Sequence, residues 1–94
     1  MRRAGGRDLT PRERPDWWTW ELELSPRLMK RVEDRQFTEL DLRRMLDRVV
    51  AIRVDVVPYR WIIATRYHRR HWEIIVEPNP ATELLVVITA YPVQ

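Results

Sequence analysis

The chain has 94 residues, a formal net charge of +3 and no cysteine. This length is enough for one domain with one hydrophobic core, and a composition of 45% apolar and 33% charged residues is typical of a soluble globular domain. The lack of cysteine excludes a disulfide framework and any site built on thiolate ligands. The longest apolar run, residues 84–91, is far shorter than the roughly 20 residues that cross a bilayer, and no secretory signal is visible. We therefore expect a cytoplasmic protein without membrane association.

The first 16 residues differ in composition from the rest of the chain. They contain five arginines, two glycines and two prolines, and Leu9 is their one large aliphatic side chain. A segment of this kind has no apolar face to bury. We therefore predict a flexible basic arm over residues 1–16 and a single folded domain over residues 17–94.

The first half of the domain is predicted to contain a strand and two helices. Apolar and acidic side chains alternate over residues 17–24, which is typical of a half-buried strand. Ser25 followed by proline is typical of a helix start and predicts a helix over residues 26–35. Thr38 is the predicted cap of a second helix, which has acidic residues in its first turn and should end near Val49.

The second half is predicted to contain only strands. Residues 51–57 are rich in β-branched side chains and stop before a proline. Residues 60–67 and 72–77 are predicted to form a hairpin, and residues 78–80 a loop. The run over residues 84–90 is apolar on both faces, which predicts a central, covered strand. The order of strand, two helices and four strands indicates an α+β fold.

The predicted hairpin separates into an apolar and a polar face when Tyr67 pairs with Trp72. In this register Arg66 lies opposite Glu73. A slip by one residue would mix the two faces, so the pattern itself supports the pairing. The side chains that we expect in the core are Trp61, Ile63, Thr65, Tyr67, Trp72, Ile74 and Val76. Those that we expect on the polar face are Arg60, Arg66, His68, His71, Glu73 and Glu77.

Positive charge is concentrated in the same hairpin. Residues 60–71 carry four arginines and both histidines, and they contain no acid. Such a segment suits a polyanion or an acidic protein partner. The alternative is a solvated sheet surface on which Arg66 and Glu73 form a weak cross-strand ion pair. His68 and His71 have no further obvious ligands beside them, so we predict neither a metal site nor a cofactor.

Two stretches of the sequence share a pattern with known proteins. The first is Trp20-Glu21-Leu22-Glu23-Leu24-Ser25-Pro26, followed by Arg31, Arg35 and Gln36-Phe37-Thr38-Glu39-Leu40-Asp41. The second runs from Arg60-Trp61-Ile62-Ile63 through Trp72-Glu73-Ile74-Ile75-Val76-Glu77-Pro78 to Leu85-Val86-Val87-Ile88-Thr89-Ala90-Tyr91. Together they resemble the RelE/ParE and BrnT-like superfamily of small bacterial toxins over residues 20–92.

The resemblance implies two helices packed on a twisted antiparallel β-sheet. It further implies a toxin that cleaves mRNA, often on the ribosome, and that pairs with an acidic antitoxin protein. By position, Arg31 and Arg35 match the basic helix residues of the family, and Arg66 and Tyr91 match its sheet residues. The chain departs from the pattern at Arg27, where the family often has histidine, and before the second helix, where it often has glycine.

Cleavage of RNA without a metal needs a base for the 2′-hydroxyl, an acid for the leaving oxygen and cations for the phosphate. His68, His71 or Glu73 would move the protons, because an imidazole titrates near neutral pH. Tyr91 would stack on a base or donate a hydrogen bond. The arginines expected to hold the phosphate are Arg31, Arg35, Arg66, Arg69 and Arg70. This hypothesis requires that arginines of the first helix and imidazoles of the hairpin share one hollow.

The second hypothesis is a binding module without chemistry. In it the same basic face docks an acidic protein partner, an antitoxin or a member of a larger complex. The mixed charge of the predicted helices and the arginine at position 27 favour this hypothesis. Sequence-specific DNA binding has weaker support, because the sequence has no recognisable pair of recognition helices.

Overall fold

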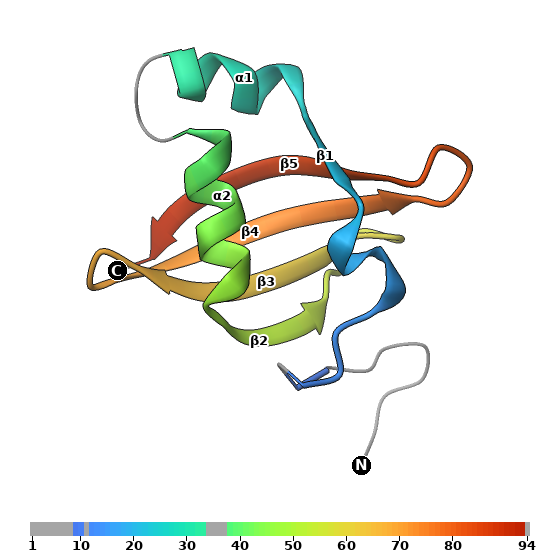
Figure 1. Cartoon of the computed structure of the whole chain (residues 1–94), viewed down its shortest axis with the longest axis horizontal. Coiled ribbons are helices and arrows are strands. Elements are labelled where there is room, and N and C mark those ends of the chain that lie inside the picture. Colours follow the sequence, from blue (N-terminus) through green and yellow to red (C-terminus); the bar gives the residue numbers. More distant parts are fainter. Residues whose placement is uncertain (1–8, 11, 34–37, 94) are drawn as a thin grey trace.

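A computed structural model describes residues 9–10, 12–33 and 38–93 of the chain (Figure 1). In chain order the elements are η1 (Asp16–Thr19), β1 (Glu21–Leu24), α1 (Pro26–Glu33), α2 (Glu39–Asp47), β2 (Val49–Val54), β3 (Trp61–Tyr67), β4 (Arg70–Asn79) and β5 (Leu84–Val93). The predicted α+β class is confirmed, with two helices on a five-stranded sheet. No helix in these described ranges combines the length and apolar character needed to cross a membrane.

The sheet is mixed, which corrects the antiparallel sheet that we expected. The strand order is β1-β5-β4-β3-β2. β5 is antiparallel to β4 but parallel to β1, with Leu22 opposite Leu85 and Leu24 opposite Val87. A parallel pair needs a long crossover, which the rest of the chain supplies between β1 and β5. Alternation of side chains is the same in both kinds of pair, so the sequence pattern could not distinguish them.

The segment before β1 is a 3₁₀ turn where the sequence predicted strand. Pro15 precedes it, and its carbonyl oxygen accepts a hydrogen bond from the Trp18 N–H at 3.0 Å. Arg43 of α2 donates to the carbonyl oxygen of Trp18 at 3.2 Å and to that of Trp20. The indole of Trp18 is thereby placed in the core, 5% exposed.

Of the predicted arm, residues 1–8 and 11 lie outside the described part, and Leu9 forms a short antiparallel bridge with Ile52 of β2.

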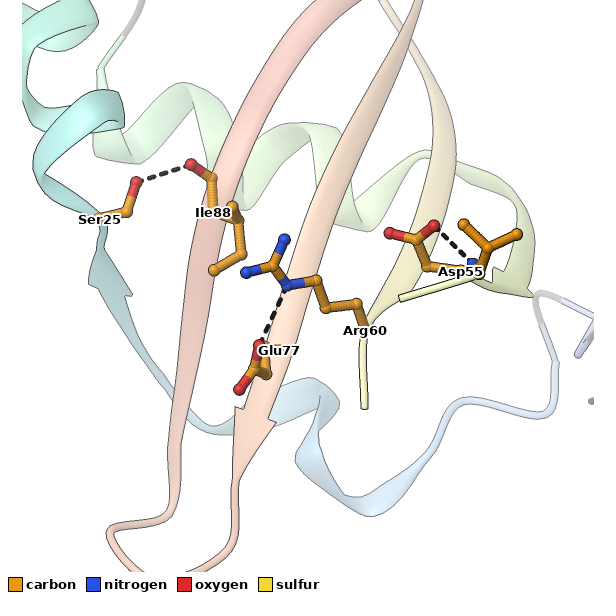
Figure 2. A network of polar contacts seen from close by, with 6 residues as sticks. Ser25, Asp55, Arg60, Glu77 and Ile88 are labelled. Carbon is orange, nitrogen blue, oxygen red and sulfur yellow. Dashed lines mark hydrogen bonds and ion pairs between the residues drawn. The ribbon is translucent and has the colours of Figure 1, made fainter. Parts of the chain in front are cut away.

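Both helices begin at the predicted caps. The Ser25 hydroxyl accepts from the Leu28 N–H at 3.2 Å and donates to the carbonyl oxygen of Ile88 at 2.6 Å, which ties α1 to β5 (Figure 2). Thr38 and Asp41 form a capping box, with reciprocal bonds of 2.8 and 3.1 Å. α2 ends at Asp47, two residues before the predicted end. The predicted last turn of the first helix, residues 34–35, lies outside the described part.

The hairpin register differs from the predicted one by two residues. Tyr67 pairs with Arg70, and Arg66 pairs with His71. A turn of His68 and Arg69 at φ values of 51° and 67° connects the strands, as in two-residue hairpin loops. A shift by two keeps every side chain on its predicted face, so the core assignment holds while the expected Arg66–Glu73 pair does not. Ala64, not Arg66, lies opposite Glu73.

The core lies between the sheet and the two helices, which cover one face of the sheet (Figure 1). α1 packs on β5, and α2 packs on β3. The fully buried side chains of this layer are Leu28, Leu42, Met45, Leu46, Ile52, Ile63, Thr65, Ile74, Val76, Leu85 and Val87. We call the other sheet face, which neither helix covers, the open face. β5 is internal to the sheet, as predicted, but the helices cover it on one face only.

Candidate functional site

A basic hollow of about 400 Å³ lies at the β3–β4 turn. Its lining residues are Arg48, Val50, Arg66, Tyr67, His68 and Arg69, and none of them is acidic. The structure therefore brings together three of the predicted site residues, Arg66, His68 and Arg69. It adds Arg48, which the sequence analysis missed because Arg48 is the residue after α2, far from the hairpin in the sequence.

Three local features of the backbone create this basic hollow. The β3–β4 turn places His68 and Arg69 at positive φ, and the His68 ring lies 4.1 Å from the Tyr67 ring, centroid to centroid. β2 is irregular between Val49 and Ala51, which leaves Val50 as an extra residue in the strand. Because β2 follows α2 directly and pairs with β3, the end of α2 reaches the same corner of the sheet.

Hydrogen bonds to α2 hold the floor of the basic hollow. The Tyr67 hydroxyl donates to Oδ1 of Asp41 at 2.5 Å. This bond lowers the pKa of Asp41 and raises the pKa of Tyr67. The buried Thr65 hydroxyl donates to the carbonyl oxygens of Met45 at 2.5 Å and Arg48 at 3.1 Å. β3 and the end of α2 are thereby fixed together, and Arg48 is held beside the β3–β4 turn.

Glu73 and Tyr91 lie on the open face, where they form a triad with Arg53. Arg53 Nη2 lies 2.8 Å from Oε2 of Glu73, and the Tyr91 hydroxyl donates to Oε1 of Glu73 at 2.7 Å. Arg53 can reach Glu73 across β3 because Ala51 of β2 and Ala64 of β3, which are paired, have small side chains. They leave room for the arginine side chain on the open face. We call these three residues the open-face triad.

Within the open-face triad, the contacts of Glu73 change the proton affinity of both Glu73 and Tyr91. The hydrogen bond from Arg53, followed by that from Tyr91, lowers the pKa of Glu73, although burial opposes the change. The bond to Glu73 raises the pKa of Tyr91. Both oxygens of the carboxylate are therefore occupied, and the phenol stays protonated. Together with Arg53, Glu73 and Tyr91 link β2, β4 and β5. They are poorly placed to exchange protons with a substrate.

Acid should remove the contribution of the open-face triad to stability. The pKa of Glu73 is lower in the folded chain than in the unfolded chain. The ion pair of Glu73 with Arg53 therefore stabilises the fold at pH values above the usual pKa of glutamate. This stabilisation is lost as the pH falls through the pKa of the folded chain. We expect Glu73→Gln to be less stable at neutral pH and to lose less stability between about pH 6 and about pH 3. Urea unfolding across this range measures both effects. Glu23→Gln, an exposed carboxylate on β1, should behave like the wild type.

The other predicted site residues do not join one hollow. Arg31 belongs to α1 on the helix layer, while Glu73 and Tyr91 face the opposite side of the sheet. Arg35 lies outside the described residues. Arg70 is exposed and does not line the basic hollow, and His71 stands opposite Arg66 on the open face. Arg31 is not among the residues that line the basic hollow, since α1 packs on β5. Its role in binding phosphate stays a prediction.

Within the described ranges, no three histidine, aspartate or glutamate side chains gather as a metal ion would require. No protein-family model, curated protein or solved structure matches this chain.

Proposed function

We propose that this protein is a metal-independent endoribonuclease of the RelE/BrnT-like toxin type, which binds the phosphate backbone of RNA in the basic hollow. The observation that carries the proposal is the gathering of Arg48, Arg66, Arg69 and His68 around one hollow that no carboxylate of the described residues lines. RNA would meet this surface in solution or on the ribosome.

The pairing of the arginines supports an anionic ligand. Arg53 and Arg60 have carboxylate partners, and Arg43 donates to backbone carbonyls. In contrast, the guanidinium groups of Arg48, Arg66 and Arg69 make no ion pair with any described residue. Like charges that converge without counter-charge repel one another, so the arrangement gains most when an anion enters. A phosphodiester suits it, because each guanidinium can offer two parallel N–H groups to phosphate oxygens.

The same corner holds the two groups that can move protons. His68 lines the basic hollow, and His71 stands opposite Arg66 at the adjoining end of the open face. In the proposed reaction one imidazole takes the proton of the 2′-hydroxyl, and the 2′-oxygen attacks phosphorus. The other imidazole gives a proton to the departing 5′-oxygen, which leaves a 2′,3′-cyclic phosphate and a free 5′-hydroxyl. Arg66 and Arg69 stabilise the additional charge on the phosphate.

Removing two arginines of the basic hollow tests the binding step. We expect Arg66→Ala combined with Arg69→Asn to weaken binding of a short single-stranded RNA by about tenfold or more. Asparagine is chosen because it tolerates the positive φ at position 69. The salt dependence, measured as log K against log salt concentration by fluorescence anisotropy, should become shallower by about 1.4, as the loss of two phosphate contacts predicts.

Arg27→Ala is the matched control, because Arg27 is an exposed arginine on α1, in the helix layer. It should change the affinity and the salt dependence little. An equal loss in this control would mean that net charge, and not the basic hollow, governs binding.

The docking of an acidic, antitoxin-like protein is the second candidate. The engagement of Glu73 and Tyr91 in the open-face triad favours it, since this leaves fewer groups for catalysis. Expression of the chain without a partner distinguishes the two. The proposed nuclease should arrest growth and shorten transcripts, whereas a docking module should be tolerated and should bind an acidic peptide in preference to RNA.

A further inference from the structure

We propose that the outer edge of β2 binds an extended segment of a partner polypeptide, which adds to the sheet as an antiparallel strand. β2 is the last strand in the sheet order, so one side of its backbone faces away from the sheet (Figure 1). The segment that fits this edge carries an apolar residue followed by an acidic one. Its binding does not depend on the proposed RNA cleavage and is measured without RNA.

Leu9 of the chain's own arm already occupies one position on this edge. Its N–H donates to the carbonyl oxygen of Ile52 at 2.7 Å, and its carbonyl oxygen accepts from the Ile52 N–H at 3.3 Å. Such a reciprocal pair is one step of an antiparallel ladder. The Leu9 side chain is partly buried and packs against the core. The edge therefore accepts a strand, and an apolar side chain fits opposite Ile52.

A second backbone position on the same edge is free. The Asp55 N–H donates to the carbonyl oxygen of Arg60 at 2.9 Å, in line with the β2–β3 ladder. Alternation along β2 then turns the N–H and C=O of Ile52 and Val54 outward. Among the described residues, none bonds to the outward backbone groups of Val54. The next outward N–H, that of Val56, is occupied by Oδ1 of Asp55 at 2.6 Å (Figure 2).

β2 has little of the protection that edge strands usually have. β1, at the other edge, has four residues, whereas β2 has six. The irregularity at Val50 disturbs only the start of β2, and Leu9 covers one position in the middle. Val50 and Val56, at the two ends of the edge, are exposed apolar side chains. An uncovered edge with apolar side chains at both ends is typical of a surface that pairs with another chain.

The charge of the open face selects the residue that follows the apolar one. When the apolar residue lies opposite Ile52, the next residue of an antiparallel strand lies opposite Ala51 and points to the open face. Ala51 and Ala64 are paired and small, so this position has room. Arg53, with a side chain 40% exposed, and Arg66, which has no ion pair with a described residue, stand on either side of it. A carboxylate would lie between the two guanidinium groups, whereas a lysine would meet like charge.

The arm of the chain is a tethered competitor for this edge, and it lacks the acidic residue. Thr10 follows Leu9, and its N–H donates to Oε1 of Glu13 at 2.9 Å, within the arm itself. Leu9 forms two backbone hydrogen bonds with β2. A partner strand that also pairs with Val54 adds two more, and its carboxylate adds the contact with the arginines. A free partner can therefore displace the arm in spite of the tether.

The test is an NMR titration of the full-length chain with the peptide N-acetyl-Val-Thr-Leu-Glu-Thr-amide. The leucine of the peptide takes the place of Leu9, and its valine lies opposite Val54. We expect the amide signals of Ile52 and Val54 to shift, and hydrogen exchange of the Val54 N–H to slow by about tenfold when nine-tenths of the chain is bound.

Two modified peptides separate the backbone contribution from the charge. N-methylleucine in place of leucine removes the donor for the carbonyl oxygen of Ile52, and it should weaken binding by about fivefold. Glutamine in place of glutamate should weaken binding by about threefold, because it removes the charge between Arg53 and Arg66.

Two substitutions in the arm should act in opposite directions. Leu9→Ser should strengthen binding of the peptide by about threefold, because it weakens the tethered competitor. Thr10→Glu should weaken binding by about threefold, because the arm then carries the carboxylate itself. Leu40→Ser, which alters an exposed leucine on α2, is the matched control and should leave the affinity unchanged. Unchanged amide signals outside the arm and β2 show that each variant is folded.

Equal binding of the N-methylated peptide would mean that charge alone holds the peptide on the protein, and it would overturn the proposal. Unchanged exchange of the Val54 N–H, or unchanged affinity in Leu9→Ser, would also overturn it. Dimerisation of Leu9→Ser that slows Val54 exchange without peptide would place a second copy on the edge and exclude a separate partner. Because no measurement involves RNA, failure of the proposed cleavage would leave these results unchanged.

Discussion

His68→Asn is expected to slow RNA cleavage by about 10²–10⁴-fold, the usual effect of removing a proton-transfer group. Asparagine cannot exchange a proton near neutral pH, but it tolerates the positive φ of position 68, so the turn should keep its shape. The three arginines around the basic hollow remain, and RNA affinity should change little. Single-turnover cleavage of an end-labelled RNA at saturating protein separates the rate of the chemical step from binding.

The double variant His68→Asn/His71→Asn sharpens this test. If the two imidazoles act as acid and base in one reaction, the double variant should be hardly slower than the more affected single variant. Urea unfolding of each variant checks that the fold is intact. Cleavage at the wild-type rate in the double variant would exclude the proposed chemistry and leave the docking of an acidic partner as the function of the basic hollow.

The hairpin shows which part of the fold its sequence determines. Alternation of apolar and polar residues specifies a face, since side chains alternate with a period of two residues. Alternation does not distinguish between registers that differ by two residues, because these place the same side chains on each face. The turn decides between such registers. His68 and Arg69 form that turn without the asparagine or glycine that usually marks it, so the sequence carried no turn signal.

The local charge of the candidate site could be predicted, but its long-range partners could not. The basic segment over residues 60–71 is contiguous in the sequence, and three of its members line the basic hollow. Arg48 and Arg53 lie outside this segment, and the pairing of β2 with β3 brings both of them close to it. Arg48 thereby lines the basic hollow, and Arg53 binds Glu73. Arg31 was predicted into the site from its position in the family resemblance, and a match of this kind does not tell which strand a helix packs on.

Ile63→Ala is expected to lower the free energy of unfolding by about 2–5 kcal/mol, the range for large apolar side chains removed from cores. Ile63 is fully buried in the middle of β3, opposite Ile52 of β2 and Ile74 of β4, which are also fully buried. Three strands meet at this point under the helix layer, so neighbouring side chains have little freedom to fill the cavity. The total free energy of unfolding of a domain is about 5–15 kcal/mol, so this loss is a large share of it.

Val56→Ala provides the contrast, because it also shortens a β-branched side chain but at a loop position that is 96% exposed. It should change the free energy of unfolding by less than about 0.5 kcal/mol. Urea unfolding followed by tryptophan fluorescence measures both variants, and equal slopes would show that the difference lies in stability rather than in the unfolded state. A cost below about 1 kcal/mol for Ile63→Ala would mean that the centre of the sheet is loosely packed. The basic hollow depends on that packing, since β3 carries Arg66 at one end and Ile63 at its middle.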